Sequence, residues 1–184
     1  VLSYGVVITA DSTSKTAYLG NVSSYILRVE NTGNTVDTFN LTLSYQTGLD
    51  FASLSTDRLT LAAGASGEVI LSVREDSTEG TYWARVNATS QGDSSKRASV
   101  IVTTTFQSAP IYGVSMSISP ASKEVERNEE AVYTVSVRNT GNREDTYTLT
   151  ATPLGTLGTN SLTISPGGTA STTLRVNGTE IRTY

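Results

Sequence analysis

The chain has 184 residues, a formal net charge of −4 at pH 7, and neither cysteine nor histidine. Disulfides, thiolate chemistry and histidine-based catalysis or metal binding are therefore excluded from these residues. The acidic balance argues against binding to nucleic acid or to an anionic membrane surface, and no apolar run approaches the roughly 20 residues of a transmembrane segment.

An internal repeat organises the chain. Residues 4–42 align without a gap with residues 112–150, at an offset of 108 residues, and the motif Asn-Thr-Gly-Asn at 31–34 recurs at 139–142. This spacing is about the length of one immunoglobulin-type sandwich. We therefore predict two domains, residues 1–106 and 112–184, joined by a short linker over residues 107–111.

The first domain is predicted to consist of β-strands, because apolar and polar residues alternate between closely spaced turn signals. In chain order the expected strands cover residues 3–10, 16–19, 25–29, 39–43, 58–61, 68–74, 81–89 and 96–105, with a loop over 46–57. The inner face of the strand at 81–89 is expected to consist of Tyr82, Ala84, Val86 and Ala88. This pattern predicts an all-β fold of two tandem Ig-like antiparallel β-sandwich domains.

The repeated motif is predicted to be the turn of a β-hairpin in each domain. Apolar residues alternate with polar ones on both sides of residues 31–34 and of residues 139–142. Gly33 and Gly141 are expected to supply a positive φ there, and the flanking asparagines to bond their own backbone.

The second copy of the repeat stops early. Tyr184 falls where Tyr82 falls in the first copy, so the second domain is expected to lack its last two strands. Such a sandwich exposes apolar inner faces and unpaired strand edges. Two explanations remain open: the 184 residues are part of a longer tandem array, or a neighbouring subunit supplies a strand by β-strand addition.

Three stretches carry a resemblance to a known domain type: residues 31–39 (NTGNTVDTF), residues 59–64 (LTLAAG) and residues 79–86 (EGTYWARV). In these the chain resembles the NEW3/CARDB-type Ig-like domains, which recur in tandem in bacterial and, especially, archaeal surface proteins, including S-layer proteins. The resemblance implies an exported surface protein. It says little about activity, because the same modules serve as spacers in cell-wall proteins, secreted proteases and glycosidases.

Four Asn-x-Ser/Thr sequons make N-linked glycans the expected modification. Strand alternation places two of them between inward-facing residues, and the others lie in or beside loops, so all four should face solvent. The acceptor residues are Asn21, Asn40, Asn87 and Asn177.

Carboxylates in the turns raise the question of calcium, which prefers oxygen ligands. Asp37 and Asp145 recur at equivalent positions, and Glu75, Asp76 and Glu79 form a second acidic group. A calcium site gathers several carboxylates, so we expect the two aspartates to brace their turns through backbone hydrogen bonds and the second group to be a solvated loop. Calcium remains the one cofactor that the sequence leaves open.

Trp83 is expected to point outward, because its neighbour Tyr82 points inward. An exposed indole serves to pack on a local loop, to cover a neighbouring domain or subunit, or to stack on sugar. Trp83 is therefore the candidate interface residue of the first domain.

These observations predict a structural module without enzymatic activity, in an extracellular protein of the cell surface or cell envelope. Its expected partners are N-linked glycans and neighbouring surface-protein domains, or further copies of itself. Two other hypotheses remain: a subunit of an extracellular filament assembled by β-strand donation, and a carbohydrate-binding accessory module of a secreted hydrolase, which would lose its polysaccharide binding on Trp83→Ala.

Overall fold

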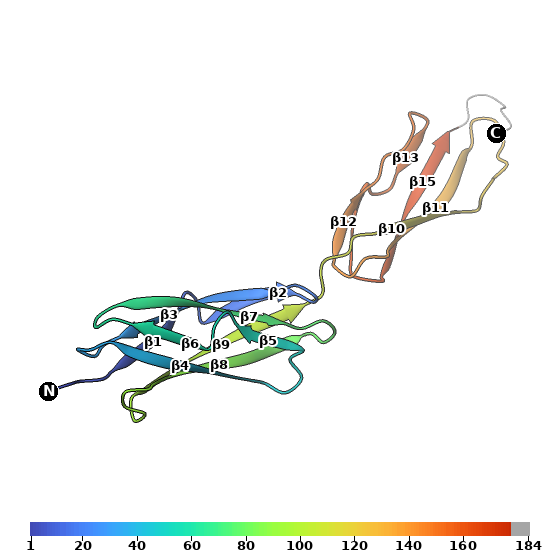
Figure 1. Cartoon of the computed structure of the whole chain (residues 1–184). Coiled ribbons are helices and arrows are strands. Elements are labelled where there is room, and N and C mark those ends of the chain that lie inside the picture. Colours follow the sequence, from blue (N-terminus) through green and yellow to red (C-terminus); the bar gives the residue numbers. More distant parts are fainter. Residues whose placement is uncertain (178–184) are drawn as a thin grey trace. The chain divides into compact units, whose positions relative to one another are not determined.

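A computed structural model describes residues 1–177, all of whose regular structure is β-strand. The chain divides into two compact units, residues 1–109 and 110–184 (Figure 1). Each unit is an Ig-like β-sandwich, which confirms the predicted fold class. None of the described residues belongs to a helix with the length and hydropathy of a membrane span.

The first unit packs two sheets face to face. One sheet has the order β1 (Val6–Ala10), β3 (Ser23–Asn31), β7 (Ser66–Arg74) and β5 (Phe51–Leu54). The other has the order β2 (Ser14–Tyr18), β9 (Arg97–Gln107), β8 (Gly80–Ser90), β4 (Asp37–Tyr45) and β6 (Arg58–Leu61). Every pairing is antiparallel except that of β2 with β9, which is parallel.

The core of the first unit follows from period-two alternation, because successive side chains of a strand point to opposite faces. On β3 every second residue from Tyr25 to Val29 is fully buried, and on β8 the inner face is the predicted one. Phe39 from β4 and Phe106 from β9 are, with Tyr25, the largest fully buried side chains between the sheets.

The predicted hairpin around residues 31–34 is wrong. β3 belongs to one sheet and β4 to the other, so the chain crosses between the sheets at this motif instead of turning back on itself. The crossing is held by the buried side chain of Asn31, whose amide nitrogen donates to the carbonyls of Thr35, Leu61 and Ala62 at 2.8–3.1 Å. Its amide oxygen accepts from the Gly33 N–H at 2.9 Å, as expected of a turn asparagine.

The glycine of the motif is required for a different reason than predicted. Neither Gly33 nor Gly141 has a positive φ. Instead, a Cβ on Gly33 would lie 2.4 Å from the carbonyl oxygen of Ser3, and a Cβ on Gly141 would lie 2.2 Å from that of Ile111. The motif therefore needs glycine because another backbone segment passes too close for any side chain.

The expected loop over residues 46–57 contains a strand. β5 pairs antiparallel with β7, with Phe51 opposite Arg74 and Leu54 opposite Leu71. The sequence signal was weak because β5 has four residues and lies at a sheet edge, where its side chains are exposed or half-buried and show no clean alternation.

The second unit repeats only part of this plan within residues 110–177. One sheet has the order β10 (Val114–Ser119), β11 (Glu130–Asn139), β15 (Thr169–Asn177) and β13 (Gly155–Leu157), and matches β1, β3, β7 and β5. The facing sheet contains only β12 (Asp145–Thr148) and β14 (Ser161–Ile164), which match β4 and β6. Counterparts of β2, β8 and β9 are absent from the described part of this unit. The alignment of Tyr184 with Tyr82 lies outside the described residues.

Candidate functional site

The four sequon asparagines all reach the surface. Asn21 lies in the turn after β2 and is exposed, and Asn177 is the last residue of β15 and is also exposed, although the Thr179 of its sequon lies outside the described residues. Asn40 on β4 and Asn87 on β8 are half-buried, and both lie between inward-facing neighbours on the outer face of their sheet.

Two sequons occupy one patch on this outer face. In the pairing of β4 with β8, Asn40 lies opposite Thr89 and Thr42 lies opposite Asn87, so each asparagine faces the threonine of the other sequon. The amide of Asn87 reaches the Thr42 hydroxyl at 3.4 Å. A shallow polar hollow of about 340 Å³ adjoins this pair and is lined by Thr42, Asn87, Thr89, Arg97, Ala98 and Ser99.

The carboxylates considered for calcium are engaged in other contacts. Asp37 is buried and accepts hydrogen bonds from the Ser90 hydroxyl and from the N–H groups of Gly92 and Thr38. It therefore braces the turn between β8 and β9 and not the crossing motif. Its equivalent Asp145 is half-buried and accepts from the Thr146 N–H. Residues 1–177 contain no group of three or more acidic side chains placed to hold a metal ion.

Glu75 departs from the expected solvated loop, because its side chain is 1% exposed. One carboxylate oxygen accepts from the Asp50 N–H at 3.2 Å, and the other accepts from the Thr78 N–H at 2.9 Å and from Ser77. Burial opposes ionisation, but these hydrogen bonds outweigh it and hold the pKa of Glu75 below its ordinary value of 4.5. Glu75 is thus a structural anion that shapes the connection from β7 to β8.

We expect Glu75→Gln to destabilise the first unit by about 2 kcal/mol at pH 7, because the amide nitrogen would face a backbone N–H that needs an acceptor. A lowered pKa in the folded state means that the carboxylate stabilises the fold above pH 4.5 and loses this contribution as the pH falls through the folded-state pKa. The difference between the two proteins should therefore shrink below pH 4.5. Denaturant titrations at several pH values measure it.

The neighbouring Asp76 gives a matched control. It forms an ion pair with Arg74 at 2.9 Å, and both side chains are well exposed. Asp76→Asn should change the free energy of unfolding by no more than about 0.5 kcal/mol, because exposed ion pairs contribute little. Equal effects of the two substitutions would contradict the structural role assigned to Glu75.

Trp83 points outward, as the strand alternation predicts. Its side chain is 40% exposed whereas Tyr82 is 8% exposed, and it lies opposite Thr103 of β9 on the outer face of the sheet. The indole is therefore available for stacking on a ligand or for contact with another protein surface. The role of Trp83 as an interface residue stays a prediction.

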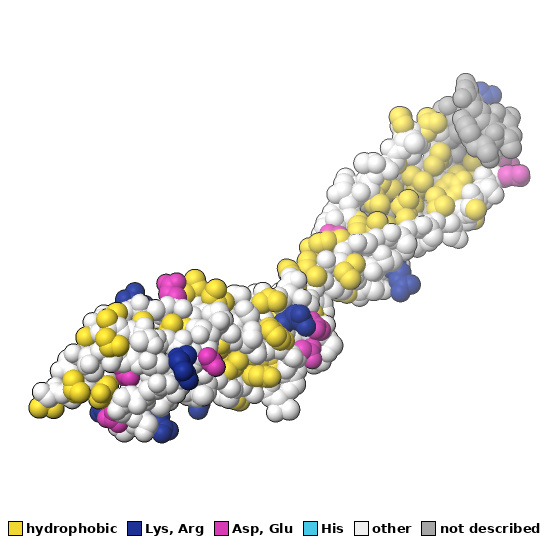
Figure 2. Space-filling model, in the orientation of Figure 1, with side chains coloured by type: hydrophobic (Ala, Val, Ile, Leu, Met, Phe, Trp, Pro, Cys, Tyr) yellow, Lys and Arg dark blue, Asp and Glu magenta, His cyan; other side chains and the backbone are white. Residues whose placement is uncertain are grey.

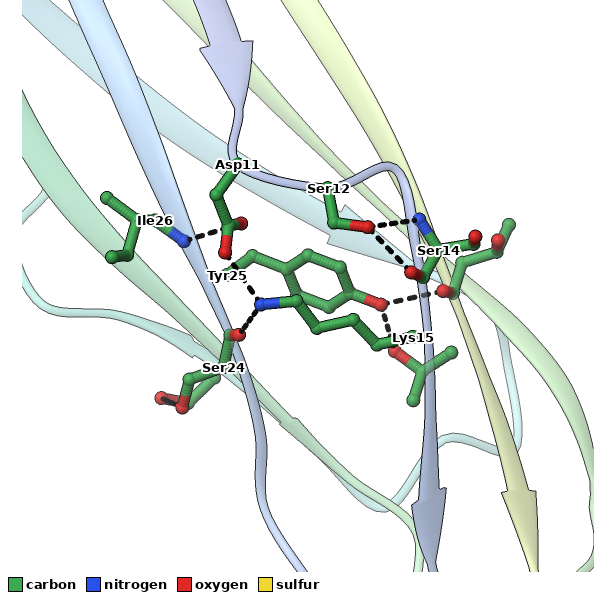
Figure 3. Close-up of polar contacts among 10 residues, drawn as sticks. Asp11, Ser12, Ser14, Lys15, Ser24, Tyr25 and Ile26 are labelled. Atoms are coloured by element: carbon green, nitrogen blue, oxygen red, sulfur yellow. Dashed lines mark hydrogen bonds and ion pairs between the residues drawn. The ribbon is translucent and has the colours of Figure 1, made fainter.

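Sequence reasoning missed a polar cluster that fastens β2 to the opposite sheet (Figure 3). The Lys15 ammonium lies 2.8 Å from a carboxylate oxygen of Asp11 and 4.7 Å from the centre of the Tyr25 ring. The Tyr25 hydroxyl contacts the Thr103 carbonyl at 2.6 Å and the Thr104 hydroxyl at 2.8 Å. The hydrogen bond from Lys15 holds the pKa of Asp11 below its usual range. The sequence signal that could have indicated this cluster is the recurrence of Lys15 and Tyr25 as Lys123 and Tyr133.

Comparison with known proteins gives similarity of fold only. No family model and no curated protein matches the chain. Among solved structures, the D00-D0 domain of Intimin is 14% identical with a TM-score of 0.41, and the match covers 95% of this chain and 87% of that chain. The YadV chaperone is 14% identical with a TM-score of 0.39, covering 94% and 85%.

The ASH/PapD-like domain 7 of human CEP192 is 18% identical with a TM-score of 0.40, and the match covers 55% of this chain and 84% of that chain. At these identities and TM-scores the similarities assign no partner and no activity to this chain. Its Ig-like fold rests on its own strand order and register.

Proposed function

We propose that the chain is a structural, non-enzymatic module of an exported, glycosylated cell-surface protein, in which Ig-like units act as spacers or lattice elements. The observation that carries the proposal is the position of the sequons. All four asparagines reach the surface, and two of them face each other's threonine on one sheet. The resemblance to NEW3/CARDB-type domains supports an S-layer or other cell-envelope protein.

A structural role fits how the polar groups of the first unit are used. The buried carboxylates of Asp37 and Glu75 accept hydrogen bonds from backbone and hydroxyl groups of their own unit, and so stabilise turns. Serine and threonine recur on the outer face of β8 and β9, beside the exposed side chains of Trp83 and Ile101. Such a surface suits a solvated, glycan-bearing spacer.

Glycopeptide mapping of the protein from its native source tests this proposal. We expect a glycan on one or more of the sequon asparagines, with Asn21 modified more completely than Asn40. The reason is that Asn21 is exposed, whereas the Asn40 amide oxygen accepts from Gln91 at 2.8 Å within the paired patch. Asn→Gln at a modified position should remove one glycan and leave the others.

Asn160→Gln is the matched control, because Asn160 is exposed but begins no sequon. It should leave the glycan mass unchanged. Unmodified asparagine at all four positions in the native protein would overturn the proposal of a glycosylated surface module, and would leave the second candidate.

The second candidate is a subunit that associates through β-strand addition. It is favoured by the second unit, where β12 pairs on one side with β14 and has no strand on its other side within residues 110–177. An unpaired strand edge next to an apolar surface is the arrangement that an added strand completes.

A further inference from the structure

The second unit exposes apolar side chains whose equivalents in the first unit are buried or half-buried. Val114, Met116 and Ile118 lie on β10 opposite buried residues of β11, so they belong to the inner face of the sheet. They are nevertheless 57%, 67% and 45% exposed. Figure 2 shows apolar side chains gathered on the visible face of this unit. These three residues, with the half-buried Tyr147 and Leu149, are called the open face below.

The first unit shows what lies over the equivalent surface. Ile8 of β1 pairs with Val29 as Met116 of β10 pairs with Val137, so Ile8 and Met116 are structural equivalents. Ile8 is 6% exposed, because β1 packs against β8 and β9 of the facing sheet. The open face is therefore the surface that a β8–β9 hairpin covers in the intact copy.

Two further segments of the second unit lack the pairing that this hairpin provides. In the first unit β8 pairs with β4 as far as Tyr45, and β9 pairs with β2. The counterpart of β4 stops being a strand at Thr148, and residues 122–126, the counterpart of β2, form no strand. Each segment forms a strand only where a partner strand is present.

The second unit also keeps the aspartate that, in the first unit, bonds the turn between β8 and β9. In the first unit Asp37 is buried against Ser90 and Gly92, which end β8 and begin the turn to β9. The equivalent Asp145 is half-buried and accepts from its neighbour Thr146. The second unit thus keeps the bond from the next residue, whereas the other two partners that Asp37 has in the first unit, Ser90 and Gly92, belong to the hairpin.

We propose that the open face is covered by a β-hairpin that enters from the end of β15, runs antiparallel to β12, and presents mainly Ala, Val and aromatic side chains inward as β8 and β9 do. This inference does not depend on export or glycosylation. It names the partner of the open face by its chemistry: two strands with alternating Ala, Val or aromatic residues on one side and polar residues on the other.

Two strands fit the observations better than one. A single added strand would pair with β12 but would leave residues 122–126 without a partner strand, because in the first unit β2 pairs with β9 and not with β8. A single strand would also cover less of the apolar side chains of β10. In the first unit the equivalent strand β1 packs against both strands of the hairpin.

Entry from β15 follows from the equivalence of β15 and β7. Leu174 lies opposite Tyr133 as Leu71 lies opposite Tyr25. In the first unit only residues 75–79 separate the end of β7 from the start of β8 in the other sheet. A connection of this length is ordinary between strands. A hairpin joined to the end of β15 by a connection of similar length can therefore reach the open face.

A graft tests the proposal on the full chain. Residues 83–107 are appended after Tyr184, so that the sequence continues as it does after Tyr82. We expect amide hydrogen exchange at residues 114–118, 122–126 and 147–150 to slow by at least about tenfold relative to the chain without the graft. The exchange rates of the first unit provide the internal reference and should not change.

Two variants of the graft provide the matched control. The grafted copy of Val86 is changed to aspartate in one variant, and the grafted copy of the outward Asn87 in the other. The inward charge should abolish the protection and the outward charge should preserve it, because a buried unpaired charge is strongly unfavourable. Equal exchange with and without the graft would overturn the proposal. The proposal also fails if the ungrafted chain forms a dimer in which the open face is already protected, since the occupant is then a second copy of the chain.

Discussion

Asn31→Asp should destabilise the first unit by about 4 kcal/mol at pH 7, which makes it one of the two most damaging substitutions that the fold predicts. The side chain is 0% exposed, and its amide nitrogen donates to three backbone carbonyls. Aspartate has nearly the same shape but brings a negative oxygen against these three acceptors. The three hydrogen bonds that hold the crossing between the two sheets would then be replaced by electrostatic repulsion.

The fluorescence of Trp83 measures this effect in the first unit alone, because Trp83 is the one tryptophan of the chain. Denaturant titration of the variant should show a lower midpoint with an unchanged slope. A buried aspartate facing carbonyl oxygens has a raised pKa, so the folded state binds the proton more tightly than the unfolded state. The loss should therefore be complete above the folded-state pKa and should diminish as the pH falls through it.

Asn34→Asp is the control in the same motif. Asn34 is exposed, and its amide group contacts the backbone of Val1 and Ser3 near the start of the chain. The identical chemical change there should alter the free energy of unfolding by less than about 1 kcal/mol. If Asn31→Asp were no worse than Asn34→Asp, the side chain of Asn31 would not hold the crossing.

The burial pattern could be read from the sequence, but the pairing of strands could not. Alternation correctly placed Tyr82 inward and Trp83 outward, because the side-chain period of a strand is fixed by its backbone. The same alternation is compatible with two strands that pair with each other and with two strands in opposite sheets. The pattern around residues 31–34 therefore predicts a hairpin, although the two strands belong to different sheets.

The repeated Asn and Gly of this motif carried more information than their turn propensity suggested. Asn31 is buried with its amide satisfied by distant carbonyls, and Gly33 is required by the approach of the backbone at Ser3. Glu75 is a similar case, because its acceptor role depends on backbone N–H groups that a sequence does not display. Alternation and composition do not predict contacts between a side chain and a backbone segment that is distant in the sequence.

Ile8→Asp should unfold the first unit or destabilise it by about 4 kcal/mol or more, whereas Met116→Asp should change the stability of the second unit by less than about 0.5 kcal/mol. The two residues are equivalent in register, and each lies opposite a buried valine of the next strand. Ile8 is 6% exposed under the hairpin of its unit, while Met116 is 67% exposed. Trp83 fluorescence measures the first variant, and hydrogen exchange of β11 and β15 the second.

The neighbouring positions separate burial from a general intolerance of charge on these edge strands. Val7, 44% exposed on the other face of β1, and its equivalent Ser115 should both accept aspartate with changes below about 0.5 kcal/mol. In the grafted chain Met116→Asp should become as damaging as Ile8→Asp, because the added hairpin would then bury position 116. A large loss for Met116→Asp without the graft would mean that the open face is already covered within the chain as it stands.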